Sequence, residues 1–293
     1  MPALDALRRH MDVVTRLRSV VRTMKLLAAA GIRQYEQATS ALGEYERTIE
    51  MGLQIAMQSP HRPRIRPAAA SSAPLGLVAF GSDQGLCGAF NDEVARRVER
   101  IARQRRRAPL AQLLAVGERC AVRLRSRGID VADVMHLPAS IAAIASLVQD
   151  IAARIEHWET SLGVGRVLLV HHRCEEARSL LAVVQLLPLD PAWLRQLAAR
   201  PWPTRVIPMF RGDWRPLFHA LARQHIWVSL FRAVAESQAA ENVSRLRAMQ
   251  AAEKNVEERL AGVQRSYFRQ RQDAITEELM DVVVGCEALG IEA

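Results

Sequence analysis

Apolar residues recur at every seventh position between Met1 and Met57, a segment that contains no proline after Pro2. A period of seven sustained over so many repeats is typical of a coiled-coil seam, along which two helices bury one apolar stripe against each other. At 1.5 Å per residue such a helix would be roughly 85 Å long, so it needs an equally long partner. The main series consists of Leu7, Val14, Val21, Ala28, Tyr35, Leu42, Ile49 and Ala56.

A weaker series begins three positions further along and is expected to complete the same seam. His10, Gly31 and Gly52 occupy some of its positions and weaken the pattern. The members that fit the pattern are Leu17, Met24, Ala38 and Tyr45.

The other end of the chain supplies a partner for this helix. Between residues 214 and 289 the only proline is Pro216, in the first turn of the expected helix, where proline is tolerated. Apolar residues recur there in heptads too, and Gln238, Asn242 and Arg245 interrupt them, as polar residues that set the register of a coiled coil do. Two long helices at opposite ends of one chain predict an antiparallel pair.

The middle of the chain alternates between strand-like and helix-like segments, which predicts an α/β layer with a mostly parallel sheet. Segments rich in proline, at 59–74 and 200–214, are expected to connect this layer to the two long helices. The predicted strands are 75–80, 110–116, 131–137, 167–172 and 180–189, and the predicted helices are 91–104, 118–126 and 140–158.

The predicted fold class is therefore α/β plus a long antiparallel α-helical coiled coil, with the sheet domain inserted between the terminal helices. Residues 1–58 are assigned to a long N-terminal helix and residues 211–293 to a long C-terminal helix. Residues 59–210 are assigned to a middle α/β domain that is Rossmann-like but does not bind a nucleotide.

The sequence lacks the loops that bind phosphate in nucleotide enzymes. Lysine occurs only at Lys25 and Lys254, and neither follows a glycine, so the Gly-Lys of a phosphate-binding loop is missing. The predicted strand 75–80 is followed by GSDQGLCG, which does not match the dinucleotide fingerprint Gly-x-Gly-x-x-Gly. We therefore expect no catalytic residues and no cofactor in this chain.

Two other groups of reactive side chains have a plainer interpretation. Asp83 and Cys87 have no histidine near them in sequence to activate the thiol, so a structural turn is expected there. A second group matches no metal-binding spacing and is interpreted as an exposed polar strand end. Its members are His171, His172, Cys174, Glu175 and Glu176.

The chain carries a formal charge of +9 and has a pI near 10.3, which favours an acidic partner. Arginine supplies all of the 40 positive charges except the two lysines. The sequence shows no apolar signal core and no uncharged apolar run of the ~20 residues that a membrane span needs. We expect a cytosolic or peripheral protein.

Three segments of the chain resemble the gamma subunits of rotary F-type ATP synthases. The segment RTMKLLAAAGIR (22–33) is similar to the signature of the family's first helix. The segment SDQGLCGAFN (82–91) resembles the family's Ser-Asp-Arg-Gly-Leu-Cys-Gly-Gly-Leu-Asn, and RQDAITEELMDVVVGCEAL (271–289) resembles its C-terminal pattern. Together with the order of the segments, the resemblance covers essentially the whole chain.

Four positions depart from the family pattern, so the chain resembles a divergent member, as an alternative ATPase operon would encode. Gln84 stands at a usual Arg, Lys25 at a frequent Glu, Gly31 at a common Lys and Glu277 at a Gln. The resemblance leaves open what these changes do, and it leaves open the coupling ion, the direction of catalysis and the size of the c ring.

The resemblance implies a rotor shaft that couples ion flow through a membrane ring of c subunits to the conformational cycle of a head of alpha and beta subunits. It also implies contact with an epsilon subunit, membrane contact only through the c ring, no nucleic-acid partner, and a place on the cytoplasmic face of the bacterial inner membrane. The catalytic residues would belong to the head, so this chain would be a non-catalytic subunit.

The resemblance also implies two sets of functional residues. The signature turn, residues 82–88, carries the family residues Ser82, Asp83, Gly85, Leu86, Cys87 and Gly88. The residues expected to contact the beta ring are Met24, Lys25, Arg271, Gln272 and Thr276.

Two functions of other classes also fit some of these features. The first is a nucleic-acid-binding or chromosome-organising coiled-coil protein with an α/β head, which the positive charge and the heptads would suit. Basic residues are not interleaved with aromatic ones, however, and no recognition motif is present. The second is a small α/β enzyme with helical arms for oligomerisation. Both stay open from the residues alone.

Overall fold

The computed structural model describes residues 2–58, 73–104, 110–175, 178–203, 205–206, 210 and 212–288. Two long helices, α1 (Pro2–Gln58) and α6 (Trp214–Ala288), contribute to both of its compact units. The smaller unit consists of Met1–Leu27 and Leu246–Ala293, and the larger unit consists of Ala28–Arg245. Nearly all of the predicted linker 59–74, and part of the predicted linker 200–214, lie outside the described residues.

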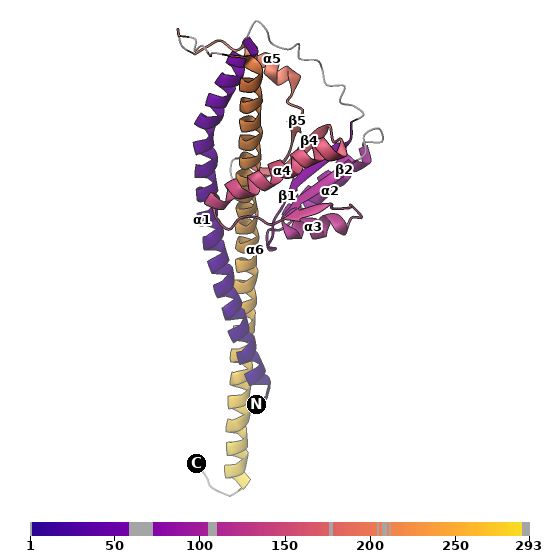
Figure 1. Cartoon of the computed structure of the whole chain (residues 1–293). Coiled ribbons are helices and arrows are strands. Elements are labelled where there is room, and N and C mark those ends of the chain that lie inside the picture. Colours follow the sequence, from indigo (N-terminus) through magenta and orange to yellow (C-terminus); the bar gives the residue numbers. More distant parts are fainter. Residues whose placement is uncertain are drawn as a thin grey trace. The chain divides into compact units, whose positions relative to one another are not determined.

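In the smaller unit, α1 and α6 lie side by side (Figure 1). Val14 packs against Val256 and Leu260, while Lys25, further along α1, contacts the earlier residue Glu253 of α6. Residue numbers thus rise along one helix and fall along the other at the contact. The predicted antiparallel pairing is confirmed in this unit.

The larger unit contains a sheet of five strands in the order β3-β2-β1-β4-β5. The first four strands along the chain pair in parallel, and β5 pairs with β4 in antiparallel fashion. The predicted mostly parallel sheet is confirmed, although β3 is shorter than the predicted strand 131–137. The strands are β1 (Leu75–Phe80), β2 (Leu110–Val116), β3 (Asp133–Met135), β4 (Arg166–Glu175) and β5 (Arg178–Leu187).

Helices cover both faces of the sheet, which explains why β1 is buried along its whole length (Figure 1). One face packs against α2 (Phe90–Gln104) and α3 (Glu118–Arg125). The other face packs against α4 (Ile144–Leu162), which follows a short 3-10 turn (Ile141–Ala143), and against α6. This second core is where the sheet and the long helices meet within the larger unit.

A short helix, α5 (Pro191–Ala199), was not predicted from the sequence. Asp190 caps it, because its side chain accepts a hydrogen bond from the backbone N–H of Ala192. Leu197 of this helix packs with Leu53 of α1 in a small apolar cluster. The helix therefore belongs to the folded part of the larger unit.

The main heptad series of α1 is confirmed, since its members are buried or half-buried. The second series is wrong at two positions: Leu17 is 50% exposed and Tyr45 is 45% exposed. The elements packed on α1 cover mainly the stripe of the first series, and Leu17 and Tyr45 lie beside that stripe rather than in it. Tyr45 instead donates a hydrogen bond from its hydroxyl to Gln224 Oε1 at 3.0 Å.

Candidate functional site

The signature turn lies directly after β1, at the carboxyl end of the parallel strands, and two backbone hydrogen bonds fix it there. The N–H of Gly81 donates to the Val116 carbonyl at 2.8 Å, and the Ser82 carbonyl accepts from Arg119 N–H at 3.0 Å. Gly117 has a φ of 110°, and a Cβ at this residue would lie 2.8 Å from the backbone of Ser82. Only glycine fits where the two turns approach so closely.

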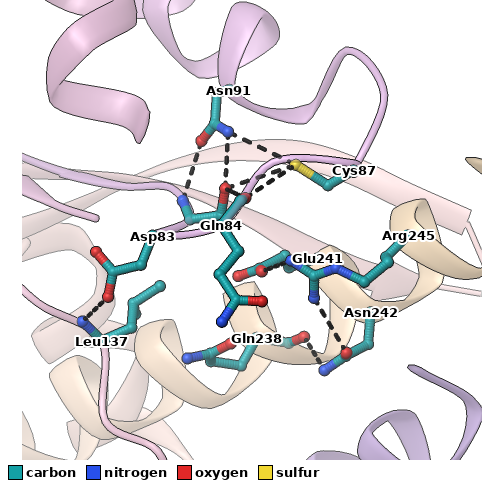
Figure 2. A network of polar contacts seen from close by, with 10 residues as sticks. Asp83, Gln84, Cys87, Asn91, Leu137, Gln238, Glu241, Asn242 and Arg245 are labelled. Atoms are coloured by element: carbon teal, nitrogen blue, oxygen red, sulfur yellow. Dashed lines mark hydrogen bonds and ion pairs between the residues drawn. The ribbon is translucent and has the colours of Figure 1, made fainter. Parts of the chain in front are cut away.

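The carboxylate of Asp83 connects the signature turn to two other elements. Its Oδ1 accepts a hydrogen bond from Glu118 N–H at 2.8 Å, and its Oδ2 accepts one from Leu137 N–H at 2.7 Å (Figure 2 shows the contact with Leu137). His136 Nδ1 lies 3.2 Å from Oδ1. Asp83 thus holds the start of α3 and the segment after β3, which confirms a structural turn.

Ser82 and Cys87 of the turn form a buried hydrogen-bonded group with Asn91. Figure 2 labels Cys87 and Asn91, with Asn91 on the side of the turn away from α6. Asn91 Nδ2 donates to Ser82 Oγ at 2.7 Å, and Asn91 Oδ1 accepts from Ser82 N–H at 3.0 Å. Cys87 Sγ lies 3.6 Å from Asn91 Nδ2. Burial raises the pKa of the Cys87 thiol, so the sulfur stays protonated and is a poor nucleophile.

The outer part of the turn is exposed and has unusual backbone geometry. Leu86 is exposed and has a φ of 65°, and Gly88 has a φ of 61°. A side chain at Gly85 would meet no atom within 4 Å. The six signature residues therefore divide into an inner group that anchors the turn and an outer group, Gly85, Leu86 and Gly88, that faces solvent.

Below the turn, α6 presents a row of polar residues, here called the polar face of α6: Gln238, Glu241, Asn242 and Arg245. Glu241 is 4% exposed and pairs with Arg245 one turn later. Arg245 Nη1 also lies 3.4 Å from Asn242 Oδ1, and Asn242 Nδ2 donates to the Gln238 carbonyl at 3.0 Å. Burial raises the pKa of Glu241 to about 7.

The polar face of α6 was predicted only as a set of interruptions in a heptad pattern, and Glu241 was not singled out. Cys87 packs with Ala240 in one apolar cluster, which brings the turn onto this face. Figure 2 shows the Gln84 side chain extending from the turn toward Gln238 and Glu241. The residues that meet here are more than 150 positions apart, so periodicity alone gives no sign of the contact.

The interpretation of His171 and His172 as an exposed strand end is wrong. His171 is 2% exposed and His172 is 0% exposed, because β4 lies between β1 and β5 and helices cover both faces. His171 Nε2 lies 3.0 Å from Glu236 of α6, and His172 Nε2 lies 3.2 Å from Glu93 of α2. The tandem histidines thus contact helices on opposite faces of the sheet.

Met24 and Lys25 lie in the smaller unit, and both are half-buried. Lys25 Nζ lies 2.5 Å from Glu253 Oε2, and Arg22 Nε lies 3.0 Å from Glu253 Oε1. These two cations hold the pKa of the Glu253 carboxyl below its usual range, Lys25 having the larger effect. The charge of Lys25 is therefore already paired within the chain.

Arg271, Gln272 and Thr276 are exposed on the last part of α6. Thr276 Oγ1 donates to the Gln272 carbonyl at 3.0 Å, a contact within the helix. Glu277, one of the departures from the family pattern, is exposed beside them. Large apolar side chains are exposed on the same stretch: Phe268, Ile275, Leu279, Met280, Val282, Val283 and Val284.

Comparison with known proteins gives one family. The family model described as ATP synthase matches residues 3–289. The ATP synthase gamma chain of an Anaeromyxobacter species is 30% identical over 99% of this chain and 100% of its own length. The gamma chain of Nostoc punctiforme is 28% identical over the same shares of the two chains.

Solved structures share the fold. A chain of the Euglena gracilis mitochondrial ATP synthase rotor has a TM-score of 0.64 and 18% identity, over 94% of this chain and 99% of its own. A chain from the OSCP/F1/c-ring assembly of the same enzyme has a TM-score of 0.65 and 17% identity, over 98% and 95%. At these identities the likeness concerns the fold.

Proposed function

The chain belongs to the family of ATP synthase gamma chains, and we propose that it works as the rotor-stalk subunit of an F-type ATP synthase. In this role it couples ion flow through a ring of c subunits to the conformational cycle of a head of alpha and beta subunits. The observation that carries the proposal is the family match across residues 3–289, which includes both long helices and the sheet between them.

The paired helices suit the transmission of torque. A coiled coil resists bending because each helix buries a continuous seam against the other. The described part of α1 buries Val14 and Val21 in the smaller unit, and Ala28, Tyr35 and Ile49 in the larger unit. In functional terms, residues 1–58 and 211–293 are the shaft and residues 59–210 are the domain that would contact the epsilon subunit and the c ring.

The chain contributes no catalytic group in this proposal. The sequence has no phosphate-binding loop, and the signature turn lies at the carboxyl ends of the strands, where an open α/β sheet binds its ligands. The Cys87 thiol in that turn is buried and protonated. ATP chemistry would therefore take place in the head.

The proposed location is the cytoplasmic face of the bacterial inner membrane, reached through the c ring. None of the helices in the described part of the chain combines the length and the apolar character that a membrane crossing requires. The relatives with the gamma-chain name include bacterial proteins, which supports a bacterial complex.

The proposed contacts with the beta ring involve Arg271, Gln272 and Thr276 at the exposed end of α6, and Met24 and Lys25 on α1. Arg271 offers a fixed fork of donors and keeps its charge, so it can hold a carboxylate or carbonyl on a turning surface. Lys25 differs, because Glu253 already neutralises it. An acidic partner would have to compete with Glu253 for this lysine.

The test is the double variant Arg271→Ala with Gln272→Ala, built into the complete complex. Folding of the full chain should be unchanged, because both side chains are exposed. Coupled ATP synthesis in membrane vesicles should fall several-fold. The matched control removes the same two side-chain types from the exposed pair Gln264 and Arg265, earlier in α6.

Two outcomes count against the proposal at different levels. Full ATP synthesis by the Arg271/Gln272 variant would refute the assignment of those residues. Failure of the tagged wild-type chain to copurify with alpha, beta and c subunits would refute the rotor role itself.

A further inference from the structure

Glu241 is buried at the point in the larger unit where three segments of the chain meet. On α6 itself it pairs with Arg245, and Cys87 of the signature turn packs on its neighbour Ala240. Asp83 and Cys87 of the turn also interact with it electrostatically. From α1 it faces the hydroxyl of Tyr35. One positive charge therefore stands beside Glu241 among these groups, and Asp83 adds a second negative charge.

The two oxygens of the Glu241 carboxyl are in different situations. Oε1 accepts from Arg245, whereas Oε2 is buried and has no hydrogen-bond partner. A buried carboxylate oxygen without a donor is unfavourable, and adding a proton to the carboxyl removes the net charge that burial penalises. Gln84, which extends toward Glu241 from the turn, is exposed and carries no charge (Figure 2).

We propose that Glu241 is a proton-sensitive contact that controls how tightly the signature turn docks on α6. The turn docks tightly when the carboxyl is protonated and loosens when it ionises. The inference depends only on contacts within the larger unit and does not depend on the proposed function.

The direction of the pH dependence follows from the two states of the carboxyl. Burial raises the pKa of Glu241 from 4.5 to about 7 while the turn is docked, and undocking would return the group to water and to its ordinary value. Between pH 4.5 and pH 7 the carboxyl is protonated in the docked state and ionised in the undocked state. Undocking therefore releases a proton, and docking weakens as the pH rises through this window. Above about pH 7 both states are ionised, and the docking equilibrium becomes constant.

Neighbouring titratable groups predict different behaviour. Burial lowers the pKa of His172, which stacks on Phe90 just after the turn, so its contribution to stability is lost as the pH falls. That trend has the opposite sign. Burial raises the pKa of both Tyr35 and Cys87 above their already alkaline values, so neither thiol nor phenol titrates between pH 4.5 and pH 7.

The experiment is amide hydrogen exchange of the full-length chain between pH 5 and pH 8, corrected for the pH dependence of the exchange chemistry. The reporter is the peptide 81–91, whose Ser82 amide donates to Asn91 Oδ1 in the docked turn. Protection of this peptide should fall by ~10-fold or more between pH 5 and pH 7.5, then stay constant.

Two variants test whether Glu241 is the responsible group. Glu241→Gln should make the protection independent of pH in this window. Glu236→Gln is the matched control on α6, because Glu236 contacts His171 and Arg173 of β4 instead of the turn. It should keep the wild-type pH dependence.

Gln84→Arg covers the case in which Glu241→Gln fails to fold, because position 84 is exposed. A guanidinium there would give Oε2 a cationic donor and keep the carboxyl ionised in the docked state. Protection at pH 7.5 should then rise, and its pH dependence should disappear. The proposal is overturned by wild-type protection that does not change from pH 5 to pH 7.5, or by unaltered pH dependence in Glu241→Gln or Gln84→Arg.

Discussion

Two stretches of α6 differ in burial, and the difference is the opposite of what their apolar content suggests. Residues 233–235 and 237–241 are all buried, yet most of them are small or polar. Residues 275–284 are all exposed, yet they include Ile275, Leu279 and Met280. Within these two stretches, small and polar side chains are therefore buried and large apolar ones are exposed.

The difference shows what surrounds each stretch. In the larger unit, the sheet and the signature turn approach α6 closely, and small residues such as Ala239 and Ala240 leave room for them. At the far end of α6, a run of large apolar side chains without cover is typical of a surface that another protein will bury. The first stretch is buried by other parts of this chain, and we expect a partner protein to cover the second.

The largest difference is expected from the same substitution made in the buried part and in the exposed part of α6. Leu230, in the buried core, is 0% exposed, and Leu279, at the end of the helix, is 60% exposed. Leu230→Ala should lower the free energy of unfolding of the isolated chain by about 2–5 kcal/mol, since it leaves a cavity. Leu279→Ala should change it by less than about 0.5 kcal/mol.

Urea unfolding of the full chain, followed by circular dichroism, measures both values. A loss of comparable size at Leu279 would mean that the isolated chain covers this end of α6 itself. The argument that a partner covers it would then be wrong.

The second prediction concerns polar groups in the two regions. Asp83→Ala removes the acceptor for the N–H groups of Glu118 and Leu137 and should cost about 1.5–3 kcal/mol. Asp273→Ala makes the same change at an exposed position of α6 and should cost less than about 0.5 kcal/mol. Chemical denaturation of both variants checks the difference, and equal costs would show that Asp83 does not anchor the turn.

Periodicity correctly predicted the parts of the fold in which equivalent positions along one helix or strand have the same neighbours. The heptads of α1 predicted its buried stripe correctly because every seventh side chain meets the same neighbouring helix. The series with Leu17 and Tyr45 failed because the number of stripes that a helix buries depends on how many elements surround it. The tertiary structure determines that number, and the spacing of apolar residues along one helix does not reveal it.

Some of the missed features did have a local signal. The pair Asp190 and Pro191, a capping residue followed by proline at the first helical position, is a typical helix start and could have predicted α5. Only a few residues separate β4 from β5, too few for the crossover that a parallel pair needs, so the antiparallel edge strand could also have been predicted.

The polar face of α6 had no such signal. Glu241 is one acidic residue among many on a long helix, and its burial depends on a turn that lies far away in the sequence. The tandem histidines are a similar case, because His171 and His172 are buried only through helices that pack on the two faces of β4. The family resemblance identified the signature turn as functional, but only the structure shows that it packs against the polar face of α6.

A small effect is expected at Glu253, in a stretch of α6 whose residues are only partly buried. Glu253 lies between the buried and exposed stretches of α6 in sequence and pairs with Arg22 and Lys25 of α1. Glu253→Gln should change the unfolding midpoint only slightly at neutral pH, because paired charges near the surface contribute little and salt screens them.

Lys25 and Arg22 hold the pKa of Glu253 below its usual range. The contribution of the pair is therefore present above the ordinary carboxyl pKa and is lost as the pH falls through the lowered value. Unfolding midpoints of Glu253→Gln and the exposed control Glu257→Gln, compared at neutral and acidic pH, measure this contribution. A wild-type advantage over Glu253→Gln that persists in acid would show that packing, and not charge, holds this contact.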